Sequence, residues 1–333
     1  MRSRTLRRAA QLRRRASLLA ARLAAQRRQS DLAVFHDFQP PPYGGGNQFL
    51  LALVRELEQR GLHVARNSVP PQTRACLFNS YNFDLARLRA FRREGCRLVH
   101  RVDGPLHEYR GFDDGTDALI ADANRELADA TILQSQWSLG RHRELGIELR
   151  QPHVIRNTVD PALFHAAGRT RWDGSRPLRL VSVSWSDNER KGGPVYAWLD
   201  GVLDRSRFEY TFVGRTRHPL PYGRMLPPQP SESLAELLRG HDAVVTASLD
   251  DPCSNALLEA LACGLPAIYV RSGGHPELVG EAGFGFDDRD EIPALLDRLT
   301  GEYEERQAAI SIPALTEVAD RYLGVLGLDD LVR

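Results

Sequence analysis

The sequence is poor in residue types that stabilise small or secreted proteins. It contains four cysteines in 333 residues, Cys76, Cys96, Cys253 and Cys263, and no Cys-x-x-Cys pair. A chain of this length buries enough apolar surface to fold without disulfides. We therefore expect a reducing, cytoplasmic environment and no zinc site. No apolar run approaches the length of about 18 residues that a membrane-spanning helix needs, so we expect no transmembrane segment.

Acidic residues are missing from the first 30 positions, which contain ten Arg. Residues 31–333 carry 34 Lys and Arg against 43 Asp and Glu, a net charge of −9. A basic arm therefore precedes an acidic body, and an acidic body is not expected to bind nucleic acid.

The arm, residues 1–30, repeats Leu and Ala near the helical period and places Arg on the other faces. This pattern predicts an amphipathic helix. Such a helix could lie on anionic lipid at the inner face of the membrane, where each Arg contributes about 1 kcal/mol. A solvated extension, a helix packed on the body or on another subunit, and an organellar presequence fit the same pattern, so these alternatives stay open.

From residue 31 onward, short apolar runs alternate with segments of helical period. The expected strands are residues 31–36, 75–78, 97–102, 131–134 and 153–155. The expected helices are residues 48–60, 84–94, 117–130 and 138–145. This alternation predicts a parallel sheet that helices cover on both faces.

The alternation restarts after Asn157. The expected strands are residues 179–184, 209–213, 243–247 and 266–270, and the expected helices are residues 193–203, 233–239, 255–263 and a segment from 292. We therefore expect an α/β protein with two Rossmann-like, doubly wound domains, residues 31–157 and 158–311. A C-terminal helix within residues 312–333 should pack back on the first domain. The cleft between the domains should face the carboxyl ends of the strands, where such sheets bind ligands.

The segment 251–266 carries the strongest functional pattern. Ser254 is a good N-cap for a helix that starts at Asn255, and the free N–H groups of that helix start suit a diphosphate. Asp251 and Glu259 lie on either side of the helix start. Carboxylates there could accept hydrogen bonds from sugar hydroxyls. A capped structural helix with a solvated Glu259 is the alternative for this pattern taken alone.

Lys191 is the only lysine, and all 43 other cationic side chains are Arg. It follows the first strand of the second domain. A compact ammonium suits a point contact with phosphate oxygens, although a single lysine could also survive by chance. Arg190 beside it either adds a second cation or faces solvent.

Three glycines, residues 44–46, join the first expected strand to its helix. They permit a tight turn and a close approach of the backbone to a ligand at a helix N-terminus. Neither GxGxxG nor GxxxxGK[ST] occurs in the chain, so neither a dinucleotide-dependent dehydrogenase nor a P-loop enzyme is indicated.

Taken together, these segments resemble the family-4 retaining glycosyltransferases of the GT-B fold. The stretch from Asp251 to Glu259 is similar to that family's Glu-x7-Glu motif. Gly44 and Gly45 match its double-glycine loop, residues 154–160 its interdomain hinge, and residues 273–277 the loop behind its donor site. The resemblance covers about residues 31–320 and leaves only the arm outside it.

The resemblance implies a hexosyltransferase that works without a metal or cofactor. It would move a sugar, with retention, from a UDP- or GDP-linked donor to a hydroxyl acceptor. A lipid-linked or glycan acceptor is favoured if the arm binds lipid, and a soluble metabolite fits as well if it does not. The first domain would bind the acceptor and the second domain the donor. Retention without an enzymic nucleophile implies that the leaving phosphate itself accepts the proton of the incoming hydroxyl.

The resemblance also implies a role for each matching residue. Glu259 would bind the ribose, and Asp251 the transferred sugar. Lys191, together with Arg190, would neutralise the leaving diphosphate. Backbone N–H groups of Ser254, Asn255 and Ala256 would hold the sugar, those of Leu257 and Leu258 would hold the diphosphate, and Gly45 and Gly46 would approach from across the cleft.

Two departures from the family pattern affect the expected site. Asp251 stands where the family usually has Glu, which shortens the reach to the sugar by one methylene. The family's histidine near the sugar aligns either with Asp103, through the glycine that follows it, or with His100. We favour Asp103, because His100 falls inside an expected strand. His107 and Glu108 come next and would contact the acceptor or simply lie on the surface.

Two other functions fit the same residues. A GT-B-fold nucleotide-sugar epimerase would form product from the donor alone, without an acceptor. A non-catalytic protein would bind the nucleotide sugar and serve as a scaffold.

Overall fold

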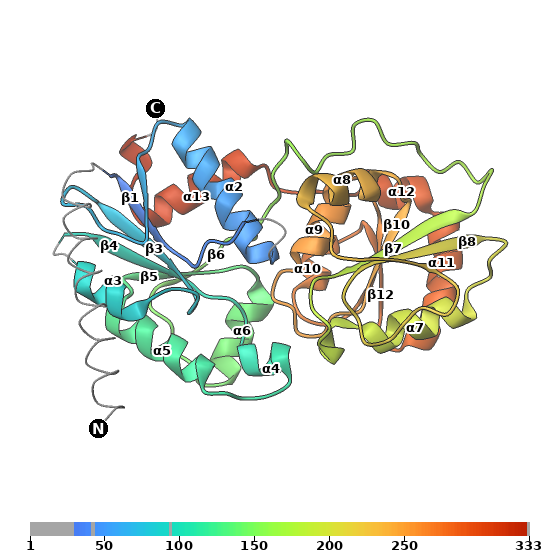
Figure 1. Cartoon of the computed structure of the whole chain (residues 1–333), viewed down its shortest axis with the longest axis horizontal. Helices are drawn as coiled ribbons and strands as arrows, with labels where there is room; N and C mark the ends of the chain where they lie inside the picture. The colour runs from blue at the N-terminus through green and yellow to red at the C-terminus, as the bar shows by residue number, and fades with distance from the viewer. Residues whose placement is uncertain (1–29, 41–43, 93–94, 332–333) are drawn as a thin grey trace, which may run out of the picture.

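The structure, a computed structural model, describes residues 30–40, 44–92 and 95–331. The predicted amphipathic arm therefore lies outside the described residues, except for Ser30. Two six-stranded parallel sheets lie side by side, and each has helices on both faces (Figure 1). This arrangement confirms the predicted α/β class with two doubly wound domains. Within the described ranges, no helix combines the length and hydrophobicity needed to cross a bilayer.

The N-terminal sheet has the strand order β2-β1-β3-β4-β5-β6. Its strands are β1 Leu32–Phe35, β2 Val64–Arg66, β3 Ala75–Asn79, β4 Arg97–Arg101, β5 Ala130–Leu133 and β6 Pro152–Val154. Its helices are α2 Gly45–Gln59, α3 Leu85–Phe91, α4 Leu106–Arg110, α5 Thr116–Leu127 and α6 Gln136–Glu144. Every residue of β1, β3 and β5 is buried, as expected for strands with helices on both sides.

The C-terminal sheet has the strand order β12-β11-β10-β7-β8-β9. Its strands are β7 Leu178–Ser184, β8 Phe208–Gly214, β9 Arg224–Leu226, β10 Ala243–Thr246, β11 Ala267–Val270 and β12 Gly283–Phe286. Its helical segments are η1 Glu189–Lys191, α7 Gly193–Val202, α8 Ser231–Arg239, α9 Asn255–Ala262, α10 His275–Val279, η2 Arg289–Glu291, α11 Ile292–Gly301 and α12 Tyr303–Ala308. The four cysteines are buried and have free thiols.

The last helix, α13 Leu315–Leu326, returns from the C-terminal domain to the N-terminal domain, and the 3₁₀ turn η3 Asp329–Leu331 follows it. Figure 1 shows α13 beside α2, far in sequence but adjacent in space. Its buried face joins the core that Leu50 and Leu53 form with the sheet. The ring of Tyr322 lies 5.9 Å from that of Phe49. The second domain boundary therefore lies in the segment before α13.

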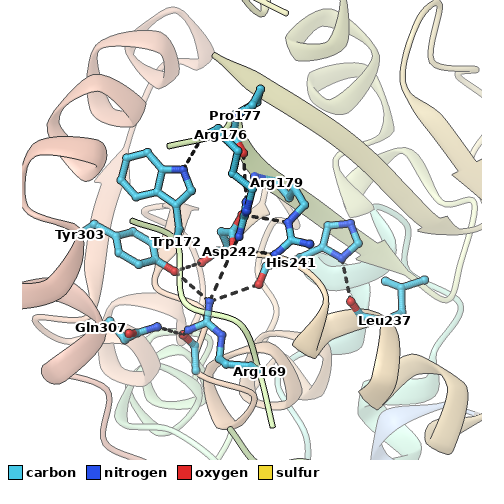
Figure 2. Close-up of polar contacts among 11 residues, drawn as sticks. Arg169, Trp172, Arg176, Pro177, Arg179, Leu237, His241, Asp242, Tyr303 and Gln307 are labelled. Atoms are coloured by element: carbon cyan, nitrogen blue, oxygen red, sulfur yellow. Dashed lines mark hydrogen bonds and ion pairs between the residues drawn. The ribbon is translucent and has the colours of Figure 1, made fainter. Parts of the chain in front are cut away.

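A buried carboxylate fixes the linker that leads into β7 (Figure 2). Asp242, which is 0% exposed, accepts hydrogen bonds from Arg176 at 2.6 and 2.9 Å and from the Arg179 Nε at 3.1 Å. Arg169 donates to the Tyr303 hydroxyl at 2.8 Å. Burial alone would raise the pKa of Asp242, but the hydrogen bonds from Arg176 and Arg179 outweigh it and lower that pKa. Because Asp242 precedes β10, this cluster lies at the end of the sheet away from the cleft.

Candidate active site between the domains

A cavity of about 310 Å³ lies between the two domains. Its lining comes from segments that follow the carboxyl ends of β1, β3, β4, β7 and β10, which is where doubly wound sheets bind ligands. A smaller cavity of about 90 Å³ adjoins it. The two cavities share Gly44, Gly45, Trp185 and Ala256 as lining residues, so they lie next to each other.

The N-terminus of α9 forms one wall of the cavity. Ser254, Asn255 and Ala256, three of the predicted donor-binding residues, line it. Asn255 and Ala256 occupy the first two helical positions, whose N–H groups have no partner within a helix. The positive end of α9 therefore points at the cavity.

The prediction for the next two residues needs correction. The Leu258 N–H donates to the Ser254 carbonyl at 3.0 Å, which closes the first turn of the helix. The Leu257 N–H faces the Ser254 hydroxyl oxygen at 3.4 Å. Both side chains are buried in the domain core. The Leu258 amide is thus already occupied, because the fourth N–H past the N-cap bonds within the helix.

Lys191 extends from η1 into the cavity. Its Nζ donates to Asp251 Oδ2 at 2.9 Å and lies 4.1 Å from the ring centroid of Tyr109. The side chains of Lys191 and Asp251 are 16% and 12% exposed. Burial disfavours both charges, but their mutual attraction outweighs it, so the pKa of Lys191 is raised and the pKa of Asp251 is lowered. Both groups are therefore charged at neutral pH.

Tyr109 is a site residue that the sequence did not reveal. It belongs to α4 of the N-terminal domain, whereas Lys191 belongs to the C-terminal domain. Its ring faces the ammonium across the cleft, an attractive geometry for a cation. No motif surrounds Tyr109, and its partner is distant in sequence, so only the folded chain brings the two together.

Glu259 lies in α9 and lines the smaller cavity together with Trp185, Pro228 and Gln229. Burial raises the pKa of Glu259 to about 8. Among the described residues, no cation or hydrogen bond offsets that burial. A partly buried carboxyl group in this state is available to a ligand that offers hydroxyl donors.

The glycine segment forms the opposite wall. Gly44 has φ of 37° and is the N-cap of α2, so Gly45 and Gly46 occupy the first helical turn rather than the predicted loop. A Cβ on Gly45 would lie 2.4 Å from the Asn255 Cβ. Only glycine therefore permits this approach. The N-termini of α2 and α9 converge on one cavity, and both favour an anion there.

Asp103 also lines the cavity, from the N-terminal side. Arg101 Nη1 donates to Asp103 Oδ1 at 3.0 Å. His100, the alternative, is 0% exposed inside β4 and stacks on Phe78 at 4.2 Å. Burial lowers the pKa of His100 to about 4. His100 is not part of the cavity lining, because its side chain points to the other face of the strand from that of Arg101.

Three further predicted residues line a separate, open groove outside the central cavity, and these are Arg190, His107 and Glu108. The Arg190 guanidinium pairs with Asp250. Glu108 accepts hydrogen bonds from the guanidinium of Arg141, and His107 Nδ1 lies 2.7 Å from Asp117 Oδ2. Each of these side chains pairs with a neighbour outside the central cavity, although the Nε of Arg190 has no hydrogen-bond partner among the described residues.

Across residues 30–40, 44–92 and 95–331, no group of three or more His, Cys, Asp or Glu side chains could hold a metal ion.

Comparison with known proteins identifies the fold and shows a family match for one segment of the chain. Residues 205–302 match the family described as "Glycosyl transferases group 1". No curated protein matches the sequence. The glycosyltransferase prediction is thereby confirmed at the level of a domain, which covers less than half of the chain.

Solved structures match almost the whole chain. Sucrose-phosphate synthase from Thermosynechococcus elongatus aligns with a TM-score of 0.70 at 15% identity, over 90% of this chain and 98% of that one. Anabaena HepE, solved with UDP-glucose, aligns with a TM-score of 0.62 at 16% identity, over 90% and 98%. AviGT4, a glycosyltransferase of avilamycin A biosynthesis, aligns with a TM-score of 0.57 at 17% identity, over 90% and 97%. The fold is GT-B.

Proposed function

We propose that this protein is a retaining, metal-independent glycosyltransferase that uses a UDP- or GDP-linked sugar. The observation that carries the proposal is the convergence of Lys191 and two helix N-termini on one interdomain cavity. A ligand with two or more negative charges fits that arrangement. The group 1 glycosyltransferase match and the UDP-glucose in HepE support a sugar nucleotide as that ligand.

The donor occupies both cavities in this proposal. Its diphosphate lies at the amides of Asn255 and Ala256, within reach of Lys191. Its nucleoside enters the smaller cavity, where Glu259 accepts hydrogen bonds from the ribose hydroxyls. Gly45 lies across from the start of α9. This position is a glycine because no side chain fits between α2 and α9 at this point.

The ion pair between Lys191 and Asp251 suggests how the donor is activated. When the diphosphate binds, the Lys191 ammonium directs N–H donors toward phosphate oxygens. Asp251 is then free to accept a hydrogen bond from a hydroxyl of the transferred sugar. As the bond between the anomeric carbon and the phosphate oxygen breaks, Lys191 and the helix amides stabilise the departing negative charge.

The acceptor approaches from the Asp103 side of the cavity. Its hydroxyl oxygen forms the new bond on the face of the sugar that the diphosphate leaves, which gives retention. The hydroxyl proton passes to an oxygen of the departing phosphate, so no protein nucleophile takes part. Asp103 orients the acceptor by accepting a hydrogen bond.

The decisive test removes the ammonium. Because a preorganised charged donor contributes about 10²–10³ in rate, Lys191→Ala should lower the turnover of a UDP- or GDP-sugar by that factor, measured as nucleotide release in the presence of EDTA. Lys191→Arg keeps the charge but presents a planar fork, and should recover only part of the activity. A full-length protein that loses activity in EDTA, or a fully active Lys191→Ala variant, would contradict the proposal.

The acceptor is a lipid-linked or glycan hydroxyl in this proposal, and the arm, residues 1–30, places the enzyme on anionic lipid. Ten Arg residues without an acid should attract such a surface. The full chain should float with vesicles that contain anionic lipid, and high salt should release it. Deletion of residues 1–29 should abolish flotation, whereas equal flotation of both chains would remove the membrane contact.

A further inference from the structure

Among the described residues of the N-terminal domain, Arg101 is the most deeply buried cation. Its side chain is 1% exposed, and its guanidinium lies 5.4 Å from the ring centroid of Phe49. Its nitrogens donate to Asn79 Oδ1 at 2.7 Å, Asp103 Oδ1 at 3.0 Å and Asn157 Oδ1 at 3.0 Å. Asp103 is its one carboxylate partner among the described residues, and it is 31% exposed toward the cavity.

These contacts continue into the other domain. Asn157 Nδ2 donates to Asn255 Oδ1 at 3.1 Å. A guanidinium can only donate, so Arg101 fixes the oxygen of the Asn157 amide toward itself and the nitrogen toward Asn255. The chain of donors therefore has one direction, from β4 through the hinge residue Asn157 to the first residue of α9.

Asn255 is also where the two helix N-termini meet. Its Cβ fills the space that a side chain on Gly45 would need. Asn255 therefore limits how closely the glycine turn of α2 can approach the start of α9. Arg101 thus connects to both walls of the cavity, to one through Asp103 and to the other through Asn157 and Asn255.

A purely structural ion pair would not require this arrangement. A buried ion pair typically adds little net stability over packed apolar side chains, whereas a directional polar network can favour one arrangement of the parts that it joins. The network of Arg101 joins β3, β4, the hinge and the donor-binding helix. Its position indicates control over how the domains sit relative to one another.

We propose that Arg101 is a positioning residue that sets the closed arrangement of the two domains. It holds Asp103 toward the acceptor and, through Asn157 and Asn255, holds the N-terminus of α9 against the glycine turn. The catalytic part of this inference rests on the proposed glycosyl transfer. The conformational part does not, because it concerns the nucleotide-free protein.

Domain closure is measured by small-angle X-ray scattering and by calorimetric titration with UDP. Asn157→Ala and Asn255→Ala each remove the hydrogen bond between these two residues, which is one of several between the domains, so both should raise the radius of gyration of the free protein. Since only the closed fraction binds well, they should weaken UDP binding about tenfold. The double variant should match Asn157→Ala, because Asn255→Ala removes a bond that Asn157→Ala has already removed.

Kinetics separate positioning from a loss of stability. Asn157→Ala should raise the donor KM about tenfold while kcat at saturating donor stays within about twofold, because bound donor restores closure. Arg101→Lys also frees Asp103 and should lower kcat as well. Asn124→Ala is the control, since Asn124 bonds to His100 and Thr131 inside the N-terminal domain. It should lower the melting temperature without moving the radius of gyration or the donor KM.

The outcomes distinguish this inference from the proposed function. Wild-type scattering and wild-type UDP affinity in both Asn variants would overturn it. If Arg101→Lys fails to fold, the two Asn variants still decide. If the wild type neither binds UDP nor transfers sugar, the proposed function fails, and the radius of gyration alone then supports or overturns the positioning role.

Discussion

At the scale of single residues, the proposed site uses two cations of different shape, Lys191 and Arg101. In the proposed mechanism Lys191 shifts between Asp251 and a phosphate oxygen, and an ammonium suits this task because it has no preferred plane. The Arg101 guanidinium, in contrast, is held by three partners at once. Under the proposed function, the mobile task and the fixed task fall to the side chains suited to them.

The carboxyl group of Glu259 should make stability depend on pH. Its folded pKa of about 8 lies above its ordinary value of 4.5, so the folded state retains a proton that the unfolded state loses. This group should therefore destabilise the fold increasingly between pH 4.5 and 8, and constantly above pH 8. Glu259→Gln should raise the free energy of unfolding by about 1–2 kcal/mol at pH 9, because one pKa unit is about 1.4 kcal/mol and the side chain is only partly buried.

Thermal melts from pH 5 to 9 would measure this effect. The stability gained by Glu259→Gln should shrink steadily as the pH falls from 9 to 5. Glu236→Gln, an exposed change on the neighbouring helix α8, should leave the pH profile of the wild type unchanged. A gain of the same size at pH 5 and pH 9 would show that Glu259 is already ionised in the folded protein.

The residues of the site were predictable to different degrees. Asp251, Ser254 and Lys191 lie in local patterns, an N-cap before a helix and a lone lysine after a strand, whose chemistry can be stated without coordinates. Tyr109 and Arg101 carry no such pattern. Their roles come from partners in other elements, and Arg101 reads as an ordinary strand residue until Asp103, Asn157 and the interdomain contact are in place.

At the scale of elements, the prediction worked best where the apolar runs were long. The central strands β1, β3, β4, β5, β7 and β10 were expected close to their observed bounds. The edge strands β2, β9 and β12 were missed. β2 and β9 have three residues each and none of them is buried, and two of the four residues of β12 are glycine, which is depleted in strands. α4 was missed as well, because five residues are too few to display a helical period. α2 begins three residues before its expected start, because the glycines enter the helix.

The Asp242 cluster is the clearest case of one residue supporting several elements. Asp242→Asn would leave Arg176 and Arg179 without their carboxylate while β7, β10 and the linker still depend on the site. Removing one partner from a buried ion pair typically costs about 3–5 kcal/mol. We expect a loss of that size in the free energy of unfolding of the C-terminal domain at pH 7, measured by urea denaturation.

The matched control for Asp242 is an exposed pair in the same domain. Arg207 and Asp297 form a bridge of 2.7 Å with side chains 47% and 58% exposed. Asp297→Asn should change the free energy of unfolding by less than about 1 kcal/mol. If Asp242→Asn is equally mild, the three surrounding arginines are solvated well enough to need no counter-ion.

At the scale of the whole molecule, the chain crosses between the domains twice. It leaves the N-terminal domain near Asn157, and it returns with α13 to pack on α2, β3 and β4. The N-terminal domain is therefore incomplete without the last residues of the chain. Its core contains Val318, Tyr322, Leu323 and Leu326 of that helix, and the cleft cannot open without moving both crossings.

Truncation after Ile312 tests this dependence. It removes the buried side chains of α13 from a single core, and losing even one large apolar side chain costs about 2–5 kcal/mol. Their sum exceeds the stability of about 5–15 kcal/mol that a domain possesses, so the N-terminal domain should fail to fold, as judged by circular dichroism and near-ultraviolet signal. A chain ending at Leu328 keeps the core and loses an exposed bridge between Arg74 and Asp330, and should melt near the wild type. A cooperative N-terminal transition in the shorter chain would mean that α13 only covers a core already complete without it.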